Sequence, residues 1–378
     1  MKSSFKTRCL AATICLTLGQ ATHGASVYWD TNGATTGSGA ATGTWGSSAF
    51  WSSDSTGATA TTATLPTAND DVFIAAGTTG TTGTITIDTA RVAGSITLEE
   101  PAANPGVTIS GGTSLTLGGG SSTNKGLFVT GNGFHTVSTP LILSGANTIQ
   151  TTGLVSNLSL LVNGGITGSG NLTLNNNSTG TSGIQIVASQ LNNTGSISNA
   201  GTSSGTVVIG NANATPASAG TGSGGLGANV ASFAQNSATS PLQFLNANNS
   251  AYTGNYDINA GTLNWAGTNP GGTVTATNAA SVINLGAPSG TAAATMNIVN
   301  NAVSGKVNNN IVVRAGSTGT KTIGVAIGGN TVTFTTTGTI TLDDNVTLNA
   351  STGPTNLVTF NPNGLISDGS YGPKGITK

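Results

Sequence analysis

The stretch "AYTGNYDINAGTLNW", from Ala251 to Trp265, contains the pattern that decides the fold. Between the turn Tyr252–Gly254 and the corner at Gly261, apolar and polar side chains alternate with a period of two, which is typical of a β-strand with one buried face. One face takes Tyr256, Ile258 and Ala260, and the other takes Asp257 and Asn259. We therefore interpret the stretch as a degenerate structural repeat, a strand followed by a corner, and not as an aromatic site.

The same pattern recurs along the chain from Thr84 onward. Short runs in which aliphatic or β-branched residues alternate with polar ones are separated by clusters of Gly, Asn, Ser and Thr, which indicates strands and turns. These runs include "TITID" (84–88), "SITLE" (95–99), "SLTLG" (114–118), "LFVTG" (127–131), "NLTLN" (171–175), "TVVIG" (206–210) and "TITLDDNVTL" (339–348). No segment has the 3.6-residue apolar period of a helix, so we predict an all-β protein.

The composition favours a right-handed parallel β-helix over a sandwich or barrel. Only 6% of the 378 residues are charged and 4% are aromatic, whereas about 25% of the residues of an average domain are charged. A β-helix coil of about 20 to 25 residues needs few and small inward side chains, while Gly and Asn form its corners. We predict this solenoid for residues 84–378, with ladders of stacked Asn and Thr and with irregular loops such as Ala217–Ser232.

Residues 1–24 have the organisation of a secretory signal peptide. Three basic residues precede the apolar run "CLAATICLTLG" (9–19), which is too short to span a membrane, and the small residues of "QATHGA" (20–25) follow it. Ala21, Gly24 and Ala25 suit cleavage, and we predict Gly24 because cleavage after Ala25 would put His23 at the third position before the bond. Both cysteines lie in this segment, so the exported chain would contain no thiol.

Removal of the signal peptide leaves seven Lys and Arg against 11 acidic residues, a net charge of −4. The remaining cations are scattered singly along the chain: Arg91, Lys125, Lys306, Arg314, Lys321, Lys374 and Lys378. A surface that binds phosphate backbones or anionic lipids needs clustered cations. We therefore expect neither nucleic-acid binding nor attachment to a membrane surface, and no transmembrane segment after signal removal.

Residues 25–83 differ from the rest because they contain most of the tryptophan. Trp29, Trp45 and Trp51 lie there together with Tyr28 and Phe50. The first coil of a solenoid leaves an open end that a bulky aromatic plug can cover, so we predict an N-terminal capping region. The alternative is a platform on which sugar rings stack, because indole faces offer flat apolar surface.

The N-terminal pattern resembles that of bacterial surface proteins with autotransporter-associated β-strand repeats. It consists of Trp29-Asp30, Trp45, Trp51, Pro66 and Asp70-Asp71-Val72-Phe73. The family's repeat, approximately GLTKxGxGTLTLSGANTYTGxTTINAGTL, is matched in pieces by "LILSGANTI" (141–149), by Tyr252–Gly254 with Ile258–Leu263, and by "GITK" (375–378). The resemblance implies an exported, β-helical passenger without an assigned activity. It also leads us to expect that the repeats continue beyond Lys378.

Three acidic doublets are the candidates for glycoside hydrolase or lyase chemistry: Asp70-Asp71, Glu99-Glu100 and Asp343-Asp344. A hydrolase needs two carboxyl groups about 5 to 10 Å apart across a cleft. Adjacent residues of a strand point to opposite faces of the sheet, so one member of a doublet cannot be the catalytic acid or base that complements the other. Asp343-Asp344-Asn345 could ligate a cation, but we interpret it as a solvated turn.

The remaining ionisable residues give no catalytic pattern either. A lyase needs a cation near the substrate carboxylate, yet Arg91 and Arg314 are isolated in the sequence. His135 lies in "GNGFHTVST" without a Ser, Cys or acid at catalytic spacing, and we interpret it as a surface turn residue. We therefore predict no catalytic, cofactor-binding or metal-binding residue and no cofactor.

These observations predict a non-enzymatic surface or secreted protein, an adhesive or structural passenger exported by bacteria. Its partners would be glycans, extracellular matrix or neighbouring cells, bound through many weak contacts. Two alternatives stay open. One is a polysaccharide-active β-helix enzyme, a lyase or glycoside hydrolase. The other is an ice-binding protein, suggested by the threonine rows "TVTAT" (273–277) and "TVTFTTTGTIT" (331–341), although their spacing is irregular.

Overall fold

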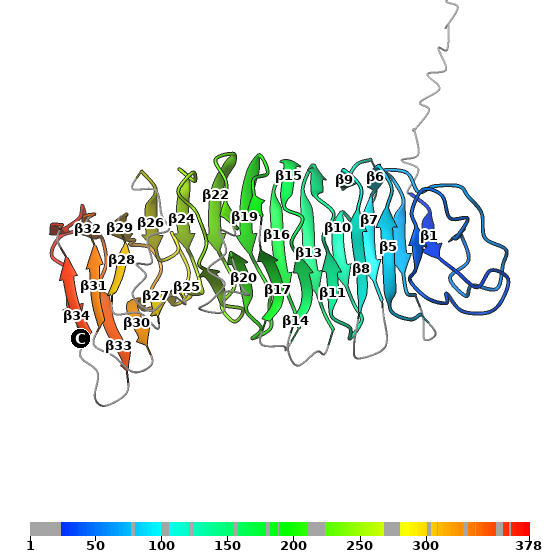
Figure 1. Ribbon diagram of the computed structural model, residues 1–378. Coiled ribbons are helices and arrows are strands. Elements are labelled where there is room, and N and C mark those ends of the chain that lie inside the picture. Colours follow the sequence, from blue (N-terminus) through cyan, green and yellow to red (C-terminus); the bar gives the residue numbers. More distant parts are fainter. Residues whose placement is uncertain are drawn as a thin grey trace, which may run out of the picture.

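The protein is an elongated β-solenoid (Figure 1). The computed structural model describes residues 24–76, 80–99, 106–120, 122, 124–153, 158–178, 182–187, 189–210, 224–267, 280–300, 304–307, 309–327, 332–336, 338–352, 358–362 and 364–378. Strands, turns and bends make up this part of the chain, and it contains no helix, which confirms the all-β prediction. The predicted signal peptide lies outside these residues except for Gly24.

Four sheets run along the solenoid. The 14-stranded sheet has the order β3 (Trp51–Ser52), β1 (Ser26–Trp29), β4 (Asp71–Ile74), β7 (Ser95–Leu98), β10 (Gly126–Val129), β13 (Asn147–Thr151), β16 (Leu172–Asn176), β19 (Gly195–Asn199), β22 (Val230–Gln235), β24 (Asn255–Ile258), β26 (Val282–Leu285), β29 (Asn310–Val313), β32 (Ile340–Leu342) and β35 (Ile366–Asp368). The 13-stranded sheet has the order β2 (Gly43–Thr44), β5 (Gly83–Ile87), β8 (Val107–Gly111), β11 (His135–Val137), β14 (Leu158–Val162), β17 (Ser182–Val187), β20 (Val207–Gly210), β23 (Leu242–Leu245), β25 (Gly261–Gly267), β27 (Ala294–Asn300), β30 (Lys321–Ile327), β33 (Val346–Thr352) and β36 (Ile376–Thr377).

Two smaller sheets complete the walls. The 6-stranded sheet has the order β21 (Gly225–Leu226), β18 (Gln190–Leu191), β15 (Ile166–Ser169), β12 (Leu141–Ser144), β9 (Ser114–Leu117) and β6 (Ala90–Ala93). The 3-stranded sheet, toward the C-terminal end, has the order β28 (Ser304–Val307), β31 (Val332–Thr336) and β34 (Val358–Pro362). From β4 onward, consecutive strands along the chain belong to different walls, as in the predicted solenoid.

Every pairing between successive coils is parallel, which confirms the parallel β-helix. Ile149 pairs with Leu174, a coil of 25 residues as predicted, whereas Ile197 pairs with Phe233, 36 residues later. The longer coil includes Ala217–Ser232, which we predicted as a loop; residues 217–223 lie outside the described part, but β21 and the beginning of β22 fall in this stretch, so the prediction is wrong there. The additional residues are accommodated with one register shift, between Gly195 and Ser196, after which the pairing with β22 continues in parallel.

The register stacks apolar side chains into columns inside the solenoid. One column of the 13-stranded sheet consists of Leu160, Ile184, Val207, Leu242, Leu263, Met296 and Ile323. Each of these side chains is at most 1% exposed. Because an inward residue of one coil meets an inward residue of the next, apolar side chains form continuous columns in the interior.

The stretch 251–265 forms β24, a corner and most of β25. Tyr256 and Ile258 are buried, while Asp257 and Asn259 are partly exposed, as the alternation predicts. Gly261 has a φ of +64°, a conformation that glycine adopts without a steric penalty. The rings of Tyr252, Tyr256 and Trp265 pack in the core with edge contacts of 4.9 and 5.8 Å between centroids, so these aromatics are structural.

β1 lies at the N-terminal end of the rod (Figure 1). Trp29, at the end of β1, packs there with Trp45 and Trp51 in a buried cluster. The Trp51 ring centroid lies 4.8 Å from those of both Trp29 and Trp45, and no indole of the three is more than 1% exposed. They offer no face for sugar stacking, so that alternative is wrong. β3, which carries Trp51, pairs antiparallel with β1 at the edge of its sheet, while β1 already pairs parallel with β4. The capping role stays a prediction.

Close contact between coils makes a specific prediction at Gly126. Gly126 has a φ of +135°, and a Cβ there would lie 1.9 Å from the Thr148 carbonyl oxygen of the next coil. Gly145 also has a positive φ, +80°, but nothing lies within 4 Å of its missing Cβ. We expect Gly126→Ala to be at least about 2 kcal/mol more destabilising than Gly145→Ala, seen as a lower melting temperature by circular dichroism. Equal effects of the two substitutions would contradict the coil spacing.

Candidate functional site

The carboxylates of Asp70 and Asp71 have separate partners. Asp70 accepts hydrogen bonds at Oδ2 from the backbone N–H and the hydroxyl of Thr67, at 2.7 and 2.8 Å. Asp71 Oδ1 accepts the hydroxyls of Ser95 and Ser122, at 2.5 and 2.7 Å. One carboxylate therefore fixes the turn before β4 and the other joins neighbouring coils, an arrangement that stabilises structure. Of the Glu99-Glu100 doublet, Glu99 follows β7 and Glu100 lies outside the described residues.

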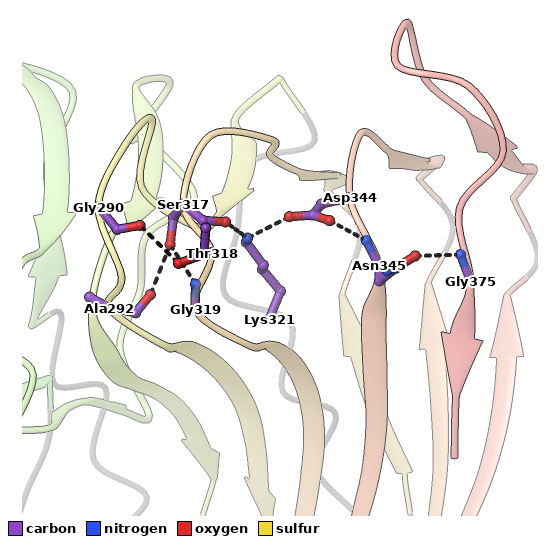
Figure 2. A network of polar contacts seen from close by, with 9 residues as sticks. All are labelled: Gly290, Ala292, Ser317, Thr318, Gly319, Lys321, Asp344, Asn345 and Gly375. Atoms are coloured by element: carbon purple, nitrogen blue, oxygen red, sulfur yellow. Dashed lines mark hydrogen bonds and ion pairs between the residues drawn. The ribbon is translucent and has the colours of Figure 1, made fainter.

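The Asp343-Asp344-Asn345 segment is a corner that joins coils, and the prediction of a merely solvated turn is wrong for Asp344. Asp344 Oδ2 lies 2.6 Å from Lys321 Nζ, and the Lys321 side chain is only 2% exposed. The ammonium of Lys321 also donates to the Ser317 carbonyl (Figure 2). Partial burial acts to raise the pKa of Asp344, but the hydrogen bond and charge of Lys321 outweigh it and keep the pKa below its ordinary value.

The contacts around Lys321 form a network, which we call the corner network, at one corner of four successive coils. It comprises Gly290, Ala292, Ser317, Thr318, Gly319, Lys321, Asp344, Asn345 and Gly375 (Figure 2). Ser317 Oγ donates to the Ala292 carbonyl at 3.0 Å, and Asn345 Oδ1 accepts the Gly375 N–H at 2.7 Å. These residues lie just before β27, β30, β33 and β36, except Lys321, which is the first residue of β30. The charged pair is thus part of the connection between coils, with its polar atoms directed at protein groups.

Arg91 and Arg314 are paired, so the interpretation of isolated cations is wrong. Arg91 forms an ion pair with Asp88, three residues before it. Arg314 lies 2.9 Å from Asp257, which also accepts a 2.8 Å hydrogen bond from Asn284 Nδ2 of the intervening coil. Arg314 and Asp257 stand on different coils and are far apart in the sequence, which is why this pair could not be predicted there, whereas Asp88 and Arg91 are close in the sequence and their pairing was missed.

His135 is buried in β11 and is not the surface turn residue that we predicted. It occupies the position of the apolar column before Leu160, with which it pairs. Its Nδ1 accepts the Val107 N–H at 3.1 Å, so Nε2 carries the proton, and Nε2 has no partner. Burial lowers the pKa of His135 from 6.5 to about 4. At neutral pH it is an uncharged core residue.

The outer faces of the two large sheets carry polar ladders between coils, as predicted. Asn175 Nδ2 donates to Gln150 Oε1 at 2.7 Å, and Asn297 Nδ2 donates to Asn264 Oδ1 at 3.2 Å. We call these half-buried residues the amide columns. Each primary amide has two N–H donors and an oxygen with two lone pairs, and a ladder bond uses only part of that capacity. The columns therefore present uncharged donors and acceptors along the rod.

A shallow groove of about 400 Å³ lies along the 6-stranded sheet. The residues that line this polar groove are Pro140, Leu141, Gly164, Gly165, Thr167, Ser189, Gln190 and Asn192. None of these lining residues is charged or a histidine. The groove can therefore bind through hydroxyl and amide hydrogen bonds, but its lining supplies no general acid or base.

In the part of the chain that the structure describes, no group of three or more His, Cys, Asp and Glu side chains could hold a metal ion. No helix in the same part is long and apolar enough to cross a membrane.

Comparison with protein-family models, with curated proteins and with solved structures gives no match to this chain.

The buried His135 predicts acid sensitivity. Its pKa is about 4 in the folded protein and 6.5 when exposed, so between these values the unfolded chain binds a proton that the folded chain does not. Stability should fall as the pH decreases from 6.5 to 4, by about 3 kcal/mol over the whole window. We expect His135→Leu to remove this part of the pH dependence, measured as melting temperatures at pH 7.5 and 5. Equal acid sensitivity of both proteins would show that His135 is exposed.

The Lys321–Asp344 pair predicts a difference between its two partners. Asp344→Asn leaves an enclosed ammonium without its counter-ion, so we expect a loss of about 1 to 3 kcal/mol. Lys321→Met removes the charge itself and should cost less, because the methylene chain of lysine is replaced by apolar atoms. Asp88→Asn, in the more exposed Arg91 pair, is the control and should cost at most about 1 kcal/mol. Urea denaturation measures all three, and an Asp344→Asn effect no larger than that of Asp88→Asn would contradict an enclosed Lys321.

Proposed function

We propose that this protein is an exported, non-enzymatic β-solenoid with a structural and adhesive role at a bacterial surface or in the surrounding medium. The observation that carries the proposal is the outer surface itself, where uncharged amides and hydroxyls recur on the coils of a rigid rod. The ionisable groups considered for catalysis are engaged in contacts within the fold, as at Asp71, Arg314 and Asp344. The resemblance to autotransporter passengers, carried by residues 29–73 and 251–263, supports the export and the surface location.

Glycans are the partners that this surface suits best. Sugar hydroxyls pair with primary amides and hydroxyls without requiring a charge, and the polar groove offers a concave, uncharged lining for such contacts. A single contact of this kind is weak. A rod that displays many of them, or several rods side by side on one surface, gains affinity through multivalency, by about 10² to 10⁴ over a single site.

The enzymatic alternative has less support. A polysaccharide hydrolase needs two carboxyl groups across a cleft, and the polar groove contains none among its lining residues. For the ice-binding alternative, the row 273–277 lies outside the described residues, as do parts of the row 331–341. Thermal hysteresis would distinguish this alternative, because a depression of the freezing point is expected of an ice-binding protein alone.

Binding to a panel of neutral polysaccharides and matrix glycoproteins tests the proposal. We expect the protein tetramerised on streptavidin to bind at least one of them at least about tenfold more tightly than the monomer. Thr167→Ala with Gln190→Ala in the polar groove should weaken this binding, whereas the pair Asn32→Ala with Thr36→Ala, exposed between β1 and β2 and outside the sheets, is the control. Release of reducing ends or unsaturated products from any polysaccharide would contradict the proposal, and so would absence of binding by the tetramer.

A further inference from the structure

The backbone of Ala25 is fixed on both sides. Its N–H donates to Asp70 Oδ1 at 2.9 Å, and its carbonyl accepts the Asp71 N–H at 2.9 Å. β1 begins at the next residue, Ser26, which pairs with Asp71. Residue 25 is thus the point at which the chain joins the 14-stranded sheet.

The neighbouring hydrogen-bond donors bind other carboxylate oxygens, so Asp70 Oδ1 accepts the N–H of Ala25. Thr67 occupies the other oxygen of Asp70 through its N–H and its hydroxyl, while Asp71 is engaged by Ser95 and Ser122. A groove of about 320 Å³ adjoins this point and is lined by Ala25, Ser26, Val27, Trp51, Ser52, Ser53 and residues between 60 and 70. Asp70 is the one charged residue in that lining. The position that faces the Ala25 nitrogen is therefore negative, with no competing cation among the lining residues.

The same nitrogen has two chemical forms. When Gly24 precedes it, the nitrogen is an amide with one hydrogen and no charge. When the chain begins at Ala25, it is an ammonium with three hydrogens and a positive charge, which an aspartate 2.9 Å away stabilises. We propose that hydrolysis of the Gly24–Ala25 bond by a leader peptidase creates an ammonium that forms an ion pair with Asp70 and thereby fastens β1 to the turn before β4. One water molecule is consumed. Its oxygen becomes part of the new carboxylate of Gly24, and its two hydrogens convert the amide nitrogen of Ala25 into an ammonium.

Geometry distinguishes this bond from the other two cleavage positions. Cleavage after Ala25 would remove the carbonyl that accepts the Asp71 N–H and the nitrogen that faces Asp70. Cleavage after Ala21 would leave Thr22–Gly24 in front of Ala25, whose nitrogen would stay an uncharged amide. Only cleavage after Gly24 puts a charge on the atom that already contacts Asp70. The inference uses the export part of the proposed function and does not depend on the ligand.

The first test is the N-terminus of the protein exported into a bacterial periplasm from the full chain. Mass spectrometry should find Ala25 as the first residue. A first residue of Thr22 or Ser26 would overturn the inference while leaving export intact. Retention of residues 1–24 on protein that stays in the cytoplasm would contradict export itself, and with it both proposals.

The second test compares the melting temperature of protein that begins at Ala25 with that of protein that begins at Thr22. The carboxylate raises the pKa of the ammonium in the folded state, so its stabilisation is complete below the unfolded value of about 8 and is lost at higher pH. We expect the Ala25 protein to melt about 1 to 3 °C higher at pH 7, because the pair is exposed, and the difference to vanish at pH 10.

Asp70→Asn should abolish this difference between the two N-termini. Asp54→Asn is the matched control, because Asp54 also caps a turn, through the N–H and hydroxyl of Thr56, but faces no N-terminus. It should leave the difference unchanged. If Asp70→Asn fails to fold, the comparison of the two N-termini with native Asp70 still decides the question. The same melting temperature for both at pH 7, or a difference that persists at pH 10, would overturn the ion pair.

Discussion

The parallel backbone ladder between successive coils is the constraint on which the rest of the structure depends. A parallel pairing fixes which residue lies above which, so an inward side chain on one coil has an inward neighbour on the next. The columns of aliphatic residues follow from this register, and so does the tolerance for coils as different as the 25 residues between Ile149 and Leu174 and the 36 between Ile197 and Phe233. The number of residues in the corners varies from coil to coil, because only the paired strands must keep their register.

The same register decides the role of the polar residues. A side chain such as Asn175 contacts Gln150 because they stand on adjacent coils, although 25 residues separate them in the sequence. Ionisable residues that would suggest chemistry in a globular enzyme here bridge coils, as Asp257 does with Asn284 and Arg314. What stays available on the outside is uncharged hydrogen-bonding surface repeated along a rod, which favours weak and multiple contacts over a single catalytic centre.

Periodicity was sufficient to predict the strands and the corner at Gly261, because both depend on neighbours along the chain. It also predicted polar ladders between coils, because outward polar residues alternate with inward apolar ones on each strand. Periodicity could not predict which individual residues contact each other between coils. His135 is surrounded in the sequence by residues typical of turns, and only its register with Leu160 places it in the interior. Lys321 and Asp344 are in contact because they stand on successive coils, and the irregular repeats do not specify how many residues a coil contains. The burial of the Asn176 and Asn199 side chains was likewise not predicted, because asparagine is a residue type usually found at the surface.

Engineered disulfides test the register most directly, because the chain from Ala25 onward contains no cysteine. Gln150 and Asn175 pair across adjacent coils with both side chains on the outer face, whereas Asn176, one residue later, points into the core. A disulfide requires Cα atoms about 4.4 to 6.8 Å apart and side chains directed toward each other. The account predicts that Gln150→Cys with Asn175→Cys oxidises to an intramolecular disulfide in the folded protein, and that Gln150→Cys with Asn176→Cys does not. Oxidation of the second pair and not the first would contradict the in-register parallel solenoid.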